Sequence, residues 1–292
     1  MSVSSAEKGP AAVRTVSLLS LQRARSTIED FALSYLPYLG LSPERDFFKY
    51  LDVLVWCEAT IYELDEQNEL MSRHGLRAPN LRLAGESSIR ESLKSLDLLD
   101  ERVEQELVQA DVYWTNERSL TAQMLKLGRY RAPQHEDPSS SPSCNSLALS
   151  EVLVTHEAKS FDYRLLFLIL HGLCGAQYNQ GLLDFLRMDE RLVDIGDDLT
   201  DYEDDVEANS FNLYRSYVFL YGSEAPLKLA ELISDLESKH GALLVQLPED
   251  YQRHYWRRHE AASSEPGSGK WSFPQPILDE SAYRSSLRSL TS

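Results

Sequence analysis

The stretch from Gly196 to Ala208 reads GDDLTDYEDDVEA, and it says more about the fold than any other part of the chain. Positions 194–207 hold eight carboxylates in fourteen residues, and no lysine or arginine occurs between Arg191 and Arg215. The acids that recur at helical steps of three and four residues are Asp194, Asp197, Asp198, Asp201, Asp204 and Asp205. On a helix these acids form one stripe, and like charges one turn apart destabilise it by roughly 0.2–0.5 kcal/mol per pair. The stripe therefore favours a cationic ligand opposite it, with divalent metal ions as the first candidates.

Other interpretations explain less of the stretch. A helix beginning at Asp197 would gain from acids in its first turn, but this accounts for one turn and not for three. A solvated helix face stays an alternative, although such a face normally intersperses lysine or arginine. A calcium-binding loop needs a glycine after its third acid, and here Val206 follows Asp205.

A second acidic cluster lies upstream, in residues 51–70. Apolar residues recur there at helical spacing and no glycine or proline interrupts them, which predicts one helix. Asp65, Glu66 and Glu69 share one face of that helix. The pattern is common on helix surfaces when it occurs alone. Paired with the downstream stripe, it predicts two helices that face each other across a cavity and hold Mg²⁺ ions bridging to a phosphorylated ligand.

At these two places the chain resembles the class I terpene synthases, and more distantly the trans-prenyl diphosphate synthases. The segment DEQNE at 65–69 looks like the family's Asp-Asp-x-x-Asp/Glu motif, with Glu66 in the second acidic position. The segment DDLTDYEDD at 197–205 is similar throughout to Asn/Asp-Asp-Leu/Ile-x-Ser/Thr-Tyr/Phe-x-x-Glu, and NSFNL at 209–213 resembles the His-Asn-x-Val that often follows. Two positions depart from the pattern: Asp201 replaces a neutral ligand, and Asp204 replaces a common basic residue.

The resemblance implies an all-α fold, the class I terpenoid synthase helical bundle around a central active-site cavity. It implies three Mg²⁺ ions, with Mn²⁺ as an alternative, and catalytic roles for Asp65 and Asp197. The metal ligands that it implies are Asp65, Glu66, Glu69, Asp197, Asp201 and Asp205. The i, i+4, i+8 spacing of the last three places their oxygens along one line of a helix.

The reaction implied is ionisation of an allylic prenyl diphosphate to a carbocation, which is cyclised or quenched to a terpenoid as pyrophosphate is released. The diphosphate also needs basic partners, and the candidates are Lys159, Arg164 and Arg284. Aromatic side chains could line the pocket and stabilise the cation. The candidates are Trp56, Tyr62, Phe161, Phe167, Tyr178 and Tyr202.

Two alternatives stay open. The chain could be an elongating transferase that joins isopentenyl diphosphate to an allylic primer, although Asp197-Asp198-x-x-Asp201 lacks the Gly- and Lys-rich surroundings of those enzymes. It could also be a non-catalytic relative that keeps the bundle as a binding or scaffold module, which the departures from the motif favour.

Composition limits the remaining choices. The 292 residues carry a net charge of −17, which argues against nucleic-acid and anionic membrane partners. Three cysteines give no framework of disulfides and favour a reducing compartment. We expect a cytoplasmic protein, with a plastid as the minor alternative; the resemblance also allows a homodimer. No apolar run is long enough to span a bilayer.

Periodicity is helical nearly everywhere. We expect a disordered arm at 1–16 and one α-helical domain at 17–292. The predicted helices cover residues 18–38, 43–73, 89–127, 147–172, 177–194, 197–222, 225–246 and 249–262. The third could be two helices, because forty residues without a cap are unusual. Serine- and proline-rich stretches near 132–146 and 263–276 predict loops.

Overall fold

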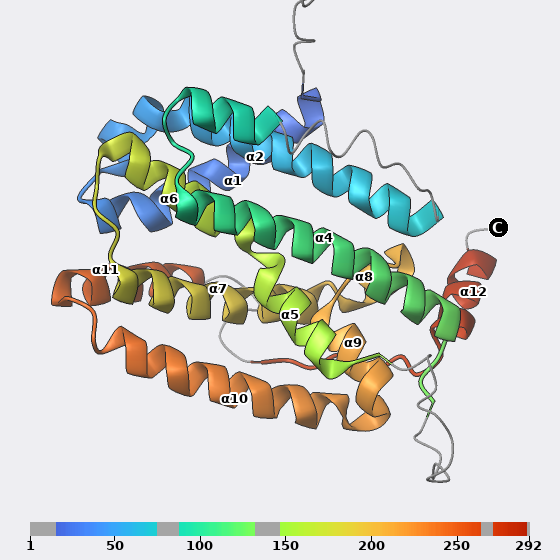
Figure 1. Cartoon of the computed structure of the whole chain (residues 1–292). Coiled ribbons are helices and arrows are strands. Elements are labelled where there is room, and N and C mark those ends of the chain that lie inside the picture. The colour runs from blue at the N-terminus through green and yellow to red at the C-terminus, as the bar shows by residue number, and fades with distance from the viewer. Residues whose placement is uncertain (1–15, 75–87, 132–146, 264–270, 291–292) are drawn as a thin grey trace, which may run out of the picture.

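The computed structural model describes residues 16–74, 88–131, 147–263 and 271–290 (Figure 1). Every regular element in these ranges is an α-helix or a short 3-10 helix. Their β-structure is limited to one isolated bridge between Arg129 and Asp279. The prediction of an all-α chain is confirmed.

The elements of the N-terminal half are α1 (Leu18–Tyr35), η1 (Leu36–Leu39), α2 (Pro43–His74), a short helix at 88–95, α4 (Glu101–Leu127), α5 (Leu149–Lys159) and α6 (Phe161–Cys174). In Figure 1 the helices α1, α2 and α6 of the N-terminal half lie at the top, and α4 and α5 lie below them. Helix α1 packs along α2, and α4 contacts α2, α5 and α6.

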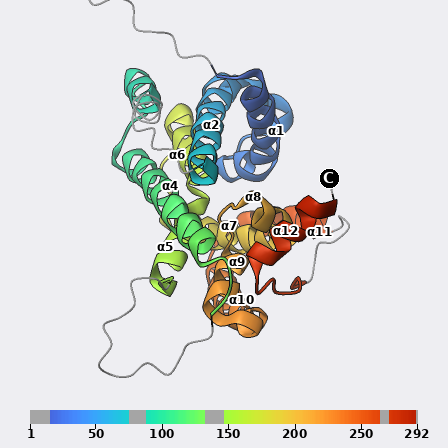
Figure 2. The same cartoon turned by 90° about the vertical axis from the view of Figure 1, so that its right-hand side faces the viewer.

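The C-terminal half of the chain forms the second group of helices. Its elements are α7 (Gln180–Thr200), α8 (Tyr202–Ala208), α9 (Leu213–Tyr221), η2 (Gly222–Glu224), α10 (Ala225–Leu244), α11 (Glu249–Ser263) and α12 (Glu280–Leu290). Helix α7 packs on α9 and α10, while α12 packs on α8. Figure 2 shows the pair α1 and α2 set apart from the group of α7, α11 and α12.

Local sequence fixes the ends of these helices. Asp100 caps α4 by accepting a hydrogen bond of 2.9 Å from the backbone N–H of Val103. Gly128 ends α4 with a φ of 69°, a conformation in which a Cβ atom would be strained. Asn179 and Asn212 cap α7 and α9 in the same way as Asp100 caps α4.

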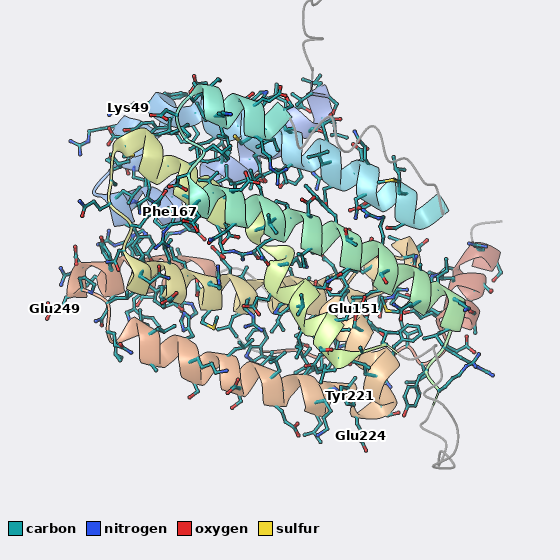
Figure 3. All side chains as sticks on the ribbon, in the orientation of Figure 1. Lys49, Glu151, Phe167, Tyr221, Glu224 and Glu249 are labelled. Atoms are coloured by element: carbon teal, nitrogen blue, oxygen red, sulfur yellow. The ribbon has the colours of Figure 1, made fainter. Side chains whose placement is uncertain are left out.

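One hydrophobic cluster runs through the bundle from α1 to α11. Its largest fully buried side chains include Trp114, Phe31 and Phe185. Figure 3 shows Phe167 inside the bundle, whereas Lys49 and Glu249 lie at its edge. Burial of such apolar surface, at about 25 cal/mol per Å², is the main force that holds the helices together.

The structure corrects several predicted boundaries. The helix expected at 89–127 is two helices, separated by a turn in which Asp97 has a φ of 59°. The helix expected at 147–172 divides at Ser160, whose backbone (φ −86°, ψ 34°) is not helical. Helix α12 was not predicted. Residues 1–15, and most of the two expected loops, lie outside the described residues.

The largest correction concerns the acidic stretch. We expected one helix to end at residue 194 and another to begin at Asp197, but α7 continues through Gly196 to Thr200. Helices α8 and α9 then replace the expected helix at 197–222, separated by Asn209 with a φ of 58°. Among the described helices, none is both long and apolar enough to cross a membrane.

Candidate functional site

A cavity of about 600 Å³ is lined by side chains from α1, η1, α2, α4, α5, α6, α7 and α11. Asp65 of α2 and Asp197 of α7 both line it. Both acidic stripes predicted from the sequence therefore reach one cavity, through Asp65 on one wall and through Asp194 and Asp197 on the other.

Helix α2 brings Asp65 to the cavity because it runs without a break through the whole acidic segment. The indole N–H of Trp114 donates a hydrogen bond of 3.1 Å to Asp65. Burial and, second, the carboxylate of Glu69 raise the pKa of Asp65 to about 6. Glu69 lies one turn further along and Glu66 is exposed. Neither of these two residues is among those that line the cavity.

The second stripe crosses the junction between α7 and α8. The backbone N–H of Asp201 donates to the carbonyl of Asp197 at 2.8 Å, and that of Asp205 donates to Asp201 at 2.8 Å. Helical hydrogen bonding thus continues across the break, so the three aspartates keep the one-turn spacing expected for them. Burial raises the pKa of Asp205 to about 6 and also raises the pKa of Asp197. Only Asp197 of the three lines the cavity.

Asp198 has a different role from its neighbours. Its side chain is 2% exposed and forms an ion pair of 2.5 Å with the ammonium of Lys159. The backbone N–H of Leu213 donates a second bond of 2.6 Å. The side chain of Asn212 donates both to the carbonyl of Asp198, at 2.5 Å, and to the carboxylate of Asp205, at 2.9 Å. These bonds fasten the start of α9 to the acidic segment.

Besides Asp65 and Asp197, five acids line the cavity: Asp30, Asp162, Asp189, Glu190 and Asp194. Asp194 accepts a short hydrogen bond from Ser160, at the junction of α5 and α6. Burial raises the pKa of Asp194 to about 7 and also raises the pKa of Asp162. Glu190 precedes Asp194 by one turn. The sequence analysis missed Glu190, although its spacing from Asp194 would have extended the stripe, and missed Asp162, which no pattern marks.

The three basic candidates lie in different places. Lys159 lines the cavity beside Asp198. Arg164 is buried behind the wall, where it pairs with Glu106 at 2.9 Å and with Glu190 at 3.4 Å. Arg284 lies on α12, outside the cavity lining. It binds Glu280 at 2.6 Å and the carbonyl of Val206 at 2.7 Å.

Another arginine reaches the cavity from a helix that the sequence analysis did not single out. Arg258 of α11 pairs with Asp30 of α1 at 2.8 Å and donates to the hydroxyl of Ser34 at 3.0 Å. These bonds join the two walls of the cavity. A basic helix gives no signal that it faces a cavity, so this residue could not be found from the sequence.

Two of the aromatic candidates, Tyr62 and Phe161, line the cavity. The other four, Trp56, Phe167, Tyr178 and Tyr202, are absent from its lining. Phe167 packs on Tyr35 with ring centroids 5.1 Å apart. The hydroxyl of Tyr202 accepts a bond of 2.9 Å from the backbone N–H of Ile277.

The cavity wall contains more polar groups than a pocket for a hydrocarbon chain needs. Tyrosines supply most of its aromatic surface: Tyr35, Tyr38, Tyr62, Tyr113, Tyr163 and Tyr255. Ile61, Leu186 and Val193 are its larger aliphatic residues. The aromatic part of the expected wall is present, whereas the aliphatic part is small.

The donor set suits Mg²⁺, which prefers carboxylate oxygens. Several buried carboxylates have raised pKa values because burial is not matched by enough positive charge. In addition, neither oxygen of the fully buried Glu58 has a hydrogen-bond partner of good geometry. A cation in the cavity would relieve this shortage for the carboxylates that line it, which do not include Glu58. Within the described ranges no three ligand side chains stand close enough together to form a ready metal site.

Comparisons with known proteins add nothing to this picture. No family model, no curated protein and no solved structure matches the chain. Its function therefore has to be inferred from the residues of the site.

Proposed function

We propose that this chain is a Mg²⁺-dependent class I terpene synthase, which ionises an allylic prenyl diphosphate and releases pyrophosphate. The observation that carries the proposal is that Asp65 and Asp197, from two acidic motifs far apart in the sequence, line one cavity. On this proposal the all-α bundle is the class I terpenoid fold.

The residues that would hold the metal ions are Asp65 and Glu69 on α2, and Asp197, Asp201 and Asp205 on α7 and α8. Bound Mg²⁺ would supply the positive charge that makes diphosphate a good leaving group. Lys159 would contribute a second positive charge on the same side of the cavity. Its ion pair with Asp198 holds the ammonium in place at 2.5 Å.

The remainder of the cavity suits a cationic intermediate. The faces of tyrosine rings attract positive charge, by about 0.5–2 kcal/mol for each ring in contact. Carboxylates such as Asp162 and Glu190 in the wall act in the same direction. The volume of about 600 Å³ lies within the usual range for small-molecule pockets.

The experiment that tests the proposal is incubation of the full chain with Mg²⁺ and, separately, geranyl, farnesyl and geranylgeranyl diphosphate. Pyrophosphate release and extractable hydrocarbons or alcohols are followed together, with EDTA as the control. We expect metal-dependent release with at least one substrate. Absence of release with all three, from protein shown to be helical by circular dichroism, would refute the proposal.

One observation favours a second candidate function. Arg164 and Arg284 do not line the cavity, and both are paired with glutamates, which leaves few cations for a diphosphate. A non-catalytic module that binds a prenyl diphosphate would tolerate this. Metal-dependent binding in calorimetry, without pyrophosphate release, would select that function.

A further inference from the structure

A hydrogen-bonded tyrosine and glutamate lie in the cavity wall, away from the acids assigned to metal. The hydroxyl of Tyr35 on α1 donates a bond of 2.8 Å to Glu190 on α7. Both residues line the cavity and both are buried. Glu190 precedes Asp197 by seven residues, which is two helical turns. The pair therefore lies about two turns of α7 away from the acid assigned to metal.

The surroundings hold this pair in one geometry. The ring of Tyr35 stacks on Phe31 with centroids 4.6 Å apart and meets the edge of Phe167 at 5.1 Å. The second oxygen of Glu190 faces the guanidinium of Arg164 at 3.4 Å. A base on rigid elements, with its orientation set by neighbours, is the arrangement that proton transfer requires.

Glu190 also belongs to the wall of a second, smaller hollow of about 70 Å³. Arg164, Glu106 and Arg187 line the same hollow, and Arg187 is 43% exposed at its outer side. Glu190 thus stands in the partition between the cavity and a polar route toward solvent.

The polar groups of the cavity wall influence which nucleophile could capture a carbocation in the cavity. Many of the residues that line the cavity carry a hydroxyl or a carboxylate group, and one of them, Asp30, is exposed. Such a wall offers water several hydrogen-bond partners, whereas an aliphatic wall offers none. Water is therefore the nucleophile that this cavity is suited to admit.

We infer that Tyr35 and Glu190 form the general base for capture of the carbocation by water, so that the product is a prenyl or cyclic alcohol. The oxygen of water forms a C–O bond to the cationic carbon as one O–H bond breaks. That proton passes to the oxygen of Tyr35, and the proton of Tyr35 passes to the carboxylate of Glu190. The inference rests on the proposed function, which supplies the cation.

The acidity of the glutamate suits this role. Burial raises the pKa of Glu190 to about 8, against the effect of Arg164. The hydrogen bond from Tyr35 also lowers it, while Asp194 and Asp162 add to the rise. A base is most effective when its pKa lies near the working pH.

The test uses Glu190→Gln and Tyr35→Phe, which keep the shapes of the side chains. Each protein is incubated in H₂¹⁸O with Mg²⁺ and the prenyl diphosphate that the wild type turns over. Pyrophosphate release, the ratio of alcohol to hydrocarbon, and ¹⁸O in the alcohol are measured. The matched control is Tyr178→Phe, which removes a tyrosine bond of 2.6 Å to Asp100 away from the cavity.

We expect the wild type to give ¹⁸O-labelled alcohol. In both variants we expect the ratio of alcohol to hydrocarbon to fall by about tenfold or more, with pyrophosphate release retained. The control should keep the wild-type ratio. Hydrocarbon alone from the wild type, or an unchanged ratio in both variants, overturns the inference but leaves the proposed function standing. Absence of pyrophosphate release from the wild type overturns both.

Discussion

The acidic stripe on α2 and the acidic stripe on α7 and α8 face the same cavity but neutralise their charge differently. On α7 and α8 the neighbours are a cation and an amide: Lys159 pairs with Asp198 and Asn212 bonds Asp205. On α2 the hydrogen bond to Asp65 comes from the neutral indole of Trp114. Burial raises the pKa of carboxyls on both stripes, among them Asp65 and Asp205, and the second stripe holds in addition the buried ion pair of Asp198.

This difference shows that equal residue types do not create equal sites. Burial of a carboxylate without a cation favours its neutral form, whereas an adjacent ammonium favours its charged form. The α7 and α8 stripe has a counter-charge in Lys159, whereas on α2 the charge of Arg23 lowers the pKa of Asp65 by less than burial raises it.

The largest expected effect is on activity. Variants of one acid from each stripe test whether the two stripes act together. Asp65→Ala and Asp197→Ala should each lower Mg²⁺-dependent pyrophosphate release by about 100- to 1,000-fold, because each removes charge stabilisation from the leaving group. Circular dichroism should remain helical. Asp204→Ala, an exposed acid of α8, serves as the control and should be nearly normal. Near-normal release by both cavity variants would show that the metal assignment is wrong.

Removal of the counter-charge from the α7 and α8 stripe should have the next largest effect. Lys159→Met leaves the buried Asp198 without its ion pair, and such a loss destabilises a fold by about 3 kcal/mol or more. The measurement is the free energy of unfolding in urea. Lys239→Met removes an exposed pair with Asp235 and should cost about 0.5 kcal/mol at most. Equal losses in the two variants would contradict the pairing that we assign to this stripe.

Sequence periodicity was enough to predict the all-α class and the approximate extent of most helices. The points at which helices end were harder to predict, because the backbone angles of Ser160 and Asp201 that end two helices are not required by any residue pattern. Helix α12 was missed because few of its residues are apolar, although Tyr283, Leu287 and Leu290 recur in it at helical spacing. It is held by tertiary contacts instead, in which Arg215 pairs with Glu280 at 2.7 Å.

The sequence predicted the two ends of the site better than its walls. Asp65 and Asp197 were found because acids at helical spacing are visible along the chain. Tyr35, Asp162 and Arg258 come from helices that meet only in the fold, so their nearness has no local signal. The same reason explains why Arg164 and Arg284 were candidates: a sequence shows a positive charge but not the glutamate that binds it.

A pH series sharpens the contrast on the α2 side. Glu117 of α4 accepts a short hydrogen bond from Asn68 of α2. Burial and, second, Asp65 raise the pKa of Glu117 from 4.5 to about 8. Because the folded state binds this proton more tightly, the stabilisation is complete below about pH 4.5 and is lost as the pH rises through about 8.

The wild type should therefore lose stability between pH 5 and pH 8 faster than Glu117→Gln does, by at most about 1.4 kcal/mol per pH unit. Urea unfolding of both proteins across this range gives the comparison. Glu91→Gln, on an exposed position of the short helix at 88–95, should follow the wild type. If the free energies of unfolding of Glu117→Gln and the wild type change in parallel with pH, protonation of Glu117 does not stabilise the fold.

The smallest expected effect is a difference in the free energy of unfolding between two variants, each of which lacks an asparagine that caps a helix. This difference measures the hydrogen bonds from Asn212 to the second stripe. Asn179→Ala removes the cap of α7 and should cost about 1 kcal/mol. Asn212→Ala removes the cap of α9 together with its bonds to Asp198 and Asp205, so its cost should be about 2 kcal/mol. The difference in the free energy of unfolding measures what the acidic stripe gains from this amide. If the two variants are equally stable, Asn212 acts as a cap alone, and Lys159 carries the neutralisation of α7 and α8 by itself.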